Sequence, residues 1–468
     1  MKRIDLTEGA IFPALARLAW PLVLGNWLQL FYNLTDMFWV GRVSTEAVAA
    51  ISLSFPTVWM SIAIGTGTSI AGAALVAQYI GAGENRRANR VAGQAVTLAV
   101  LASGALAAIA IPARGWLLTQ MGATAETLPL ASDYLGIIFA GLPFAWSFFA
   151  LWSVLRGAGD ALTPMWLMVI STGLNMILDP FLILGWAGLP ALGLRGAAIA
   201  TLLSRGVAAG AGLYLLFSGR RGIHVSWKDL WPELPLIKQL VKIGAPASLD
   251  GAVRSLSAVV MISIVARFGT IPVAAFGVVT RVMSVVWTTS MGIGQAVGTT
   301  VGQNLGARRP ERAERAAWGA TALDFALLTV GGLLFFAFPK PVISIFIKDR
   351  EVIEAGASFL RIIVLASGFW GSLSIIQGAF QGAGRTVPAM ICSLLQRWVI
   401  PIPLALLFGF TLDFGVHGVL WAMVIGFVMS ALIGVLWFRL GHWKTAVIGE
   451  VELEVELTGD EVPRSDPW

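Results

Sequence analysis

The segment Gln78-Tyr79-Ile80-Gly81-Ala82 returns as Gln303-Asn304-Leu305-Gly306-Ala307, 225 positions further along a chain of 468 residues. Other short motifs recur at about the same distance: Ala19-Trp20-Pro21 and Gly244-Ala245-Pro246, Val48-Ala49-Ala50 and Val273-Ala274-Ala275, and Gly157-Ala158-Gly159 and Gly382-Ala383-Gly384. A period this long indicates a duplicated domain, because solenoid repeats are only 20 to 50 residues long. The chain is therefore expected to fold as two similar halves.

The composition places both halves in a lipid bilayer. Hydrophobic residues make up 57% of the chain and charged residues 12%, and the mean hydropathy is +0.79. Soluble domains usually carry about 25% charged residues, so a soluble core would not hide this much apolar surface. Membrane proteins built from two structural repeats are often transporters, with the substrate bound between the repeats.

Apolar stretches of about 20 residues are long enough to cross roughly 30 Å of hydrocarbon as helices. Twelve such stretches recur, and those at 131–155 and 357–380 are the least regular. They are 17–40, 51–78, 91–113, 131–155, 163–187, 195–217, 240–264, 276–303, 316–338, 357–380, 386–410 and 417–438. The expected fold is an all-α polytopic membrane protein with twelve transmembrane helices in two lobes of six.

The duplication and the spans together divide the chain into four parts. Residues 1–217 are expected to form an N-lobe with helices 1 to 6, and 237–440 a C-lobe with helices 7 to 12. Between them, 218–236 is predicted to be a cytoplasmic linker, and 441–468 an acidic cytoplasmic tail.

Basic residues alternate from loop to loop, and this alternation predicts the orientation. The richer loops contain Arg86, Arg87, Arg90, Arg156, Arg220, Arg221, Lys228, Lys238, Arg308, Arg309, Arg312, Arg315 and Arg385. Both termini are thus predicted to be cytoplasmic in the inner (plasma) membrane. Six spans per half give the halves the same orientation, related by a pseudo-twofold axis along the membrane normal. The net charge of +6 reflects this topology and indicates no nucleic-acid partner.

Several chemistries are excluded by the residues present. A single cysteine, Cys392, allows neither an internal disulfide nor a cysteine metal cluster. No GxxxxGK phosphate loop occurs, so ATP is not expected to drive the protein directly and no cofactor is expected. A lipid-modifying membrane enzyme is a further alternative, but it should carry polar catalytic residues in a substantial loop, and these loops are short. The chain is therefore expected not to be an enzyme.

Ionisable residues inside the spans are the strongest functional candidates, because each costs about 2.5–3.5 kcal/mol at the bilayer centre on insertion scales. The first half offers Asp36 and Asp179 with the amide of Asn175. The second half offers one acid and three arginines, and the two halves therefore differ in sign: Asp250, Arg254, Arg281 and Arg397.

Helix geometry brings the first group together. In the predicted orientation Asp36, Asp179 and Thr201 lie at similar depths, roughly 8–13 Å below the outer ends of their helices. Asn175 and Asp179 are four residues apart and share one helix face. Tyr134, near the outer start of the fourth span, can reach the same layer. Two carboxylates in a low dielectric do not both ionise cheaply, so a shared proton or sodium ion is expected between them.

These motifs resemble the multidrug and toxic compound extrusion (MATE) family, within the wider multidrug/oligosaccharidyl-lipid/polysaccharide exporter superfamily. The resemblance rests on Pro21 with Asn33-Leu34-Thr35-Asp36-Met37-Phe38-Trp39-Val40-Gly41, Arg156-Gly157-Ala158-Gly159-Asp160, Asn175-Met176-Ile177-Leu178-Asp179-Pro180 and Gly196-Ala197-Ala198-Ile199-Ala200-Thr201. It implies two lobes in a V with a central cavity, and alternating access. It also implies export of small organic, often cationic, drugs in exchange for protons or sodium. The chain is expected to act as a monomer.

The resemblance also implies roles for individual residues. Asp36, Asn175, Asp179 and Thr201 would hold the proton or sodium ion, with Tyr134 beside them. The substrate cavity would include Gln29, Asn33, Arg254 and Arg281. In some sodium-using members the C-lobe also holds a cation, but Arg254 and Trp370 occupy the matching acidic positions here, so that site is expected to be absent.

Two questions stay open at this point. Asp250 precedes Arg254 by four residues, which favours an intrahelical ion pair, while Arg281 and Arg397 can bind Asp250, backbone carbonyls or an anionic substrate group. A lipid or lipid-linked oligosaccharide flippase of the same superfamily is the alternative function, since arginines in the C-lobe would suit a phosphate.

Overall fold

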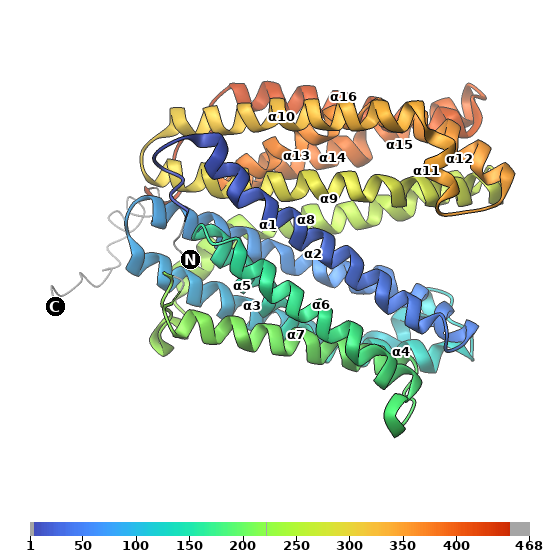
Figure 1. Ribbon diagram of the computed structural model, residues 1–468, viewed down its shortest axis with the longest axis horizontal. Helices are drawn as coiled ribbons and strands as arrows, with labels where there is room; N and C mark the ends of the chain where they lie inside the picture. The colour runs from blue at the N-terminus through green and yellow to red at the C-terminus, as the bar shows by residue number, and fades with distance from the viewer. Residues whose placement is uncertain (1–3, 221, 450–468) are drawn as a thin grey trace.

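The computed structural model describes residues 4–220 and 222–449, and within these ranges every regular element is a helix (Figure 1). Nine single helices are long and apolar enough to span a membrane: α1 (Ile11–Val40), α2 (Thr45–Gly81), α3 (Asn85–Gln120), α6 (Leu162–Leu184), α7 (Leu194–Phe217), α8 (Leu234–Ala266), α9 (Thr270–Gly306), α10 (Pro310–Ala337) and α16 (Gly415–Arg439). A tenth span, Thr386–Thr411, is divided into α14 (Thr386–Leu394), a π-helical turn at Leu395–Val399, α15 (Pro401–Leu406) and a second π-helical turn at Leu407–Thr411.

The fourth and tenth predicted spans are broken helices. The fourth consists of α4 (Thr127–Ala140) and α5 (Leu142–Gly157), bent by 47°, and the tenth of α12 (Arg350–Val364) and α13 (Ser367–Gly382), bent by 52°. Pro143 lies in the first turn of α5, where its missing N–H is tolerated; it could not continue α4, because proline removes a helical hydrogen bond and its ring clashes with the carbonyl four residues earlier. Counting each bent pair as one span gives the twelve that hydropathy predicts.

The short elements lie in the connections. They are η1 (Trp186–Gly188), η2 (Trp227–Leu230) and α11 (Pro339–Ser344). In the linker, Gln94 of α3 donates to the carbonyls of Asp229 (2.8 Å) and Trp231 (2.7 Å), and its own carbonyl accepts from the N–H of Glu233 (2.9 Å). One buried amide side chain thus fixes the linker against the N-lobe.

The two halves form two lobes that lie close together at the end carrying the termini and diverge toward the other end (Figure 1). The duplication is exact in places, since α2 and α9 begin and end 225 positions apart. The first helix of each half packs on the opposite half, α1 on α9 and α8 on α2. Helix α1 therefore starts against the C-lobe and ends beside α6 of the N-lobe (Figure 1).

The repeated motif of α2 and α9 forms the contact between the lobes at the closed end. A Cβ atom on Gly81 would collide with the backbone carbonyl of Gln303, and one on Gly306 with that of Gln78. The Gln78 amide donates to the Gly382 carbonyl (3.2 Å), and the Gln303 amide donates to the Gly157 carbonyl (2.9 Å). Glycine permits the close backbone approach, and the two glutamines satisfy the last carbonyls of α13 and α5.

The described start of the predicted tail packs on the same contact. Trp443 is buried and stacks on Phe438 with ring centroids 4.4 Å apart, and the backbone N–H of Val447 donates to the Gln78 side chain (2.9 Å). Lys444 pairs with Glu314 of α10 at 2.8 Å. Residues 441–449 are therefore part of the folded structure, whereas the acidic residues from 450 onward lie outside the described residues.

Candidate ion and substrate sites

The structure brings the predicted N-lobe residues into one polar site. Thr201 of α7 donates a long hydrogen bond of 3.5 Å to Oδ2 of Asp36 at the end of α1. On α6 the amide of Asn175 donates to Oδ1 of Asp179 (3.3 Å), as their spacing of four predicts. The carboxyl groups of Asp36 and Asp179 lie within electrostatic range of each other, and Tyr134 of α4 is buried within range of both.

Three acceptor oxygens of this site have no hydrogen-bond partner among the described residues. They are Oδ1 of Asp36, Oδ1 of Asn175 and Oδ2 of Asp179, and each is buried. Buried polar atoms are nearly always paired, so three orphaned acceptors in one place indicate a site for a positive charge. A carboxylate can take up a proton, and both carboxylate and amide oxygens can coordinate a hard cation such as sodium.

Close helix packing brings the site together, and each of the two helices that carry its acids contains a proline. Gly196 of α7 lies so near the Leu182 carbonyl of α6 that a Cβ atom there would collide with it, which brings Thr201 toward α6. Pro180 follows Asp179 inside α6, and Pro21 lies inside α1. Each proline removes a helical hydrogen bond, so both acid-bearing helices have a weakened turn.

Arg205, one turn after Thr201 on α7, is a buried cation beside this site that the sequence analysis missed. Its Nη2 donates to Oε1 of Gln29 at 2.6 Å. Its guanidinium carbon lies 4.6 Å from the Tyr32 ring centroid, 5.1 Å from Phe148 and 5.3 Å from Phe149. Only 6% of Arg205 is exposed, and Asp36 lies within electrostatic range of it. The first half therefore combines acids with an arginine, and the predicted contrast in sign between the halves was too simple.

Gln29 and Asn33, predicted to line a substrate cavity, lie on the same face of α1 next to this arginine. The Gln29 amide donates to Oδ1 of Asn33 (3.3 Å), while its carbonyl oxygen accepts from Arg205. Tyr32 and Ser204 share a buried hydrogen bond of 2.9 Å, and Ser204 in turn donates to the Thr201 carbonyl (3.0 Å). The candidate ion site and the arginine thus share α1 and α7.

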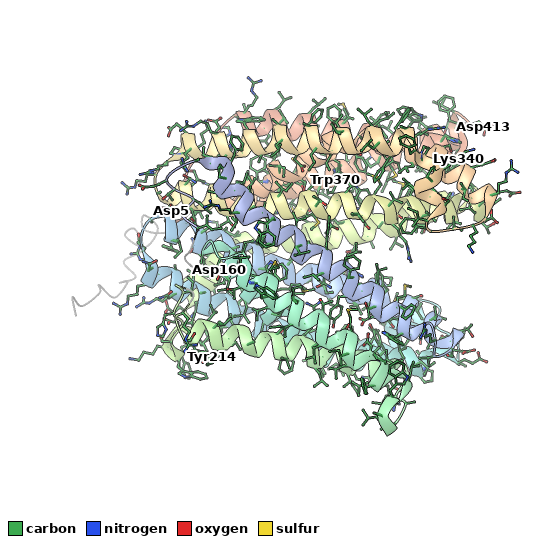
Figure 2. All side chains as sticks on the ribbon, viewed as in Figure 1. Asp5, Asp160, Tyr214, Lys340, Trp370 and Asp413 are labelled. Carbon is green, nitrogen blue, oxygen red and sulfur yellow. The ribbon has the colours of Figure 1, made fainter. Side chains whose placement is uncertain are left out.

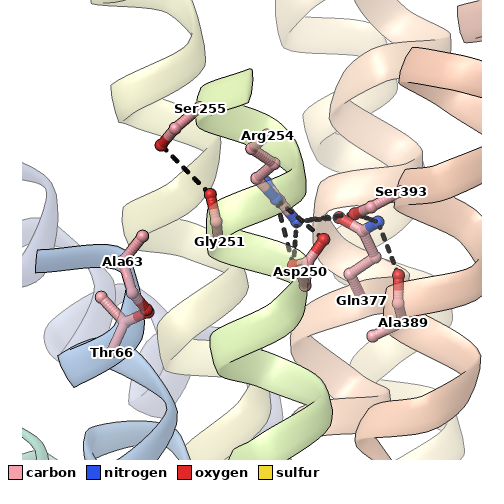
Figure 3. A network of polar contacts seen from close by, with 9 residues as sticks. All are labelled: Ala63, Thr66, Asp250, Gly251, Arg254, Ser255, Gln377, Ala389 and Ser393. Atoms are coloured by element: carbon pink, nitrogen blue, oxygen red, sulfur yellow. Dashed lines mark hydrogen bonds and ion pairs between the residues drawn. The ribbon is translucent and has the colours of Figure 1, made fainter. Parts of the chain in front are cut away.

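In the C-lobe, Arg254 is tied into a polar network across three helices (Figure 3). Its Nε lies 3.1 and 3.2 Å from the two carboxylate oxygens of Asp250, one turn earlier on α8, which confirms the intrahelical pair. Its Nη2 donates to Oε1 of Gln377 on α13 (3.1 Å) and to Oγ of Ser393 on α14 (3.0 Å). Bidentate ion pairing holds this guanidinium to the protein, although 27% of its side chain is exposed.

The other C-lobe candidates are more dispersed. Arg281 lies on an exposed part of α9, and Arg397 lies in the first π-helical turn of the eleventh span, close to Arg254 and Asp250. The Nε atom of Arg397 is buried and has no hydrogen-bond partner among the described residues. Trp370 is buried within the C-lobe (Figure 2), and its ring lies 5.7 Å from that of Trp287.

Asp324 of α10 is a fully buried acid that the sequence analysis also missed. Ser290 of α9 donates to its Oδ2 at 2.5 Å, and its Oδ1 has no partner among the described residues. The residue lies inside the ninth predicted span, 316–338, so it could have been identified in the sequence as an ionisable residue within a span. Within the described ranges no three His, Cys, Asp or Glu side chains converge as a metal site.

The family model described as MatE matches this chain twice, at residues 21–181 and 246–407, and the two matches start 225 positions apart. A probable multidrug resistance protein, YoeA of Bacillus subtilis, is 30% identical over 88% of this chain and 90% of its own length. An FAD transporter of Shewanella oneidensis is 31% identical over 94% of this chain and 96% of its own. The probable multidrug resistance protein NorM of Thermotoga maritima is 28% identical over 95% of each chain.

Solved structures give the same picture. A MOP superfamily transporter from Pyrococcus furiosus, reported for the reverse polarity of its binding pocket, has a TM-score of 0.88 and 27% identity over 95% of this chain and 99% of that one. An outward-facing multidrug resistance MATE family transporter also has a TM-score of 0.88 and 27% identity, covering 94% and 98%. Both the sequence motifs and the two-lobe architecture agree with these matches. The chain therefore belongs to the MatE family of multidrug and toxic compound extrusion transporters, and it is a membrane transporter rather than an enzyme.

Proposed function

We propose that this protein is a secondary antiporter that exports organic compounds in exchange for protons or sodium ions, with the coupling ion bound in the N-lobe. The observation that carries the proposal is the set of three orphaned acceptor oxygens on Asp36, Asn175 and Asp179. These oxygens come from α1 and α6, and Thr201 of α7 donates to the other carboxylate oxygen of Asp36, Oδ2. Binding a positive charge there relieves both the missing hydrogen bonds and the repulsion between two acids.

Helix α1 links this ion site to the arrangement of the lobes. Its first half packs on the C-lobe, where Phe12 meets Gly319 of α10 and Val23 meets Gly292 of α9. Its second half carries Asp36. An ion that binds Asp36 in one arrangement of α1 and not in another changes the balance between the two lobe arrangements, and Pro21 supplies the weak turn. Export then needs only that ion and substrate prefer different arrangements.

The relatives support a small organic cargo without fixing its identity. Two are named as probable multidrug resistance proteins and one as an FAD transporter, although all match this chain over nearly its whole length. In this proposal the protein acts as a monomer in the plasma membrane. Both termini lie in the cytoplasm, because basic residues are enriched in the loops of that side. The closed end of the two lobes, which carries the termini, then faces the cytoplasm (Figure 1).

The test uses Asp36→Asn in the full-length protein. The amide keeps the shape of the side chain but accepts no proton and carries no charge for sodium. We expect drug-linked proton or sodium flux in proteoliposomes to be lost while the amount of protein in the membrane is unchanged. The matched control is Asp133→Asn, because Asp133 pairs with Arg195 at the protein surface and lies outside the site. Retained flux in the Asp36 variant would refute the ion-site assignment, and lipid scrambling without flux would favour a flippase.

A further inference from the structure

Arg205 occupies a place of the kind that proteins use to bind organic cations. Three aromatic rings surround its guanidinium at 4.6 to 5.3 Å, and the oxygen of Gln29 accepts a hydrogen bond from it. Rings at this distance attract a cation through their negative faces, which is how aromatic cages recognise quaternary ammonium ligands. In this protein the cage formed by Tyr32, Phe148, Phe149 and Gln29 is filled by the protein's own cation.

A filled cage changes which compounds the N-lobe can accept. An organic cation would have to displace a guanidinium that belongs to the fold, or else lie beside it and meet like-charge repulsion in a low dielectric. An acidic group meets the opposite situation. A guanidinium has five N–H donors, and the side chains of Gln29 and Met168 use two of them in this structure. A carboxylate or phosphate would find further donors and an opposite charge.

The C-lobe also contains arginines within its spans. Arg397 lies within electrostatic range of both Arg254 and Asp250, and Arg254 pairs with Asp250. Arg254 contacts both carboxylate oxygens of Asp250, as Figure 3 shows, whereas the Nε of Arg397 has no hydrogen-bond partner among the described residues. An arginine within a span almost always faces the bundle interior or a water-filled cavity rather than lipid. Each lobe therefore contains a guanidinium that makes no hydrogen bond to a carboxylate of the described residues, Arg205 in the N-lobe and Arg397 in the C-lobe.

We propose that the exported compound carries an acidic group, a carboxylate or a phosphate, and that Arg205 excludes permanently cationic compounds from the N-lobe. This inference rests on the proposed export function and narrows its substrate class. Arg205 acts by its charge and its position in the cage, so a lysine should keep the preference for anionic compounds and an uncharged side chain should not. The Asp36 and Asp179 site stays available for the coupling ion, because Arg205 bonds to Gln29 rather than to either carboxylate.

Two dyes of opposite charge test the proposal, ethidium as the permanent cation and carboxyfluorescein as the anion. Binding to the purified full-length protein is measured by fluorescence anisotropy, and transport in proteoliposomes that carry an ion gradient. We expect the wild type to prefer carboxyfluorescein by at least tenfold in both measurements. Arg205→Lys should keep that preference. Arg205→Met and Arg205→Gln should weaken carboxyfluorescein binding at least tenfold and strengthen ethidium binding by a similar factor.

The outcomes separate the proposal from the export function. A wild type that binds ethidium more tightly, or that binds neither dye, overturns the charge inference. So does an unchanged preference in Arg205→Met with a melting temperature equal to that of the wild type. If both uncharged variants fail to fold, the proposal is judged by whether the wild type and Arg205→Lys prefer carboxyfluorescein to ethidium. Binding of carboxyfluorescein with the expected preference but no transport contradicts the export function and leaves the charge inference standing.

Discussion

Substitution of Gly81 by alanine should open the contact between the lobes at the end that carries the termini. The new Cβ atom would collide with the backbone carbonyl of Gln303, which unlike a flexible side chain has no rotamer that moves it away. The collision is relieved when α2 and α9 separate. Overpacking of a tight contact costs about 1–3 kcal/mol. That energy corresponds to a roughly 5- to 150-fold shift of the equilibrium away from the observed arrangement. Gly306→Ala should act in the same way, because its Cβ atom would meet the Gln78 carbonyl.

The shift can be measured as a distance between spin labels on the two lobes. Arg86 at the start of α3 and Glu311 at the start of α10 are exposed and lie 225 positions apart, so Arg86→Cys and Glu311→Cys give a symmetry-related pair. The native Cys392 is fully buried and should not label. Double electron–electron resonance should show a longer distance gaining population in Gly81→Ala.

Gly115→Ala is the matched control. Gly115 is also a helical glycine, but a Cβ atom there would meet nothing within 4 Å. It should leave the distance distribution unchanged, because alanine at an open helical position favours the helix and introduces no clash. The reasoning about the contact is wrong if Gly81→Ala folds with normal thermal stability and its distance distribution matches that of the control.

Two further predictions concern buried polar groups. Gln78→Ala should lower the melting temperature more than Gln303→Ala, because Gln78 bonds both the Gly382 carbonyl and the Val447 N–H, whereas Gln303 bonds the Gly157 carbonyl. Each orphaned group costs about 1–3 kcal/mol. Equal decreases in melting temperature in a thermal-shift assay would contradict this. Asp324→Asn should raise the melting temperature, because a neutral side chain of the same shape replaces an acid with one unpaired oxygen, and a lower melting temperature would show that the carboxyl group stabilises the fold.

The sequence was sufficient for features that depend on spacing along one helix. Twelve spans follow from hydropathy, and the pairs Asn175 with Asp179 and Asp250 with Arg254 follow from a spacing of four. Depth in the membrane also brought Asp36 and Thr201 together, since each is fixed by its distance from a helix end. These predictions needed no knowledge of which helices are neighbours.

Features that depend on how the helices pack against one another could not be predicted from spacing along one helix. Arg205 was visible as a charge within the sixth predicted span, but its partners Tyr32 and Phe148 come from α1 and α5, and only their packing forms the cage. The break before α5 had a signal in Pro143, whereas the break before α13, at Leu365 and Ala366, lies at residues that do not interrupt helices on their own. Tertiary packing overrides local preference at such places.

The two halves differ most clearly at a place where equivalent buried space is filled by different side chains. Ser290, Asp324 and Gly371 of the C-lobe correspond, 225 positions earlier, to Gly65, Ala99 and Trp146 of the N-lobe. In the N-lobe, Gly65 makes room for the indole of Trp146, which would lie 2.6 Å from an added Cβ atom. In the C-lobe the glycine is Gly371, and the space beside it is taken by the carboxyl of Asp324 and the hydroxyl of Ser290. Close packing requires that the space be filled, but it does not dictate whether an aromatic ring or a polar pair fills it. One scaffold can therefore hold different charges in its two copies, as Arg205 and Asp324 do here, without losing the glycine contacts that join the lobes.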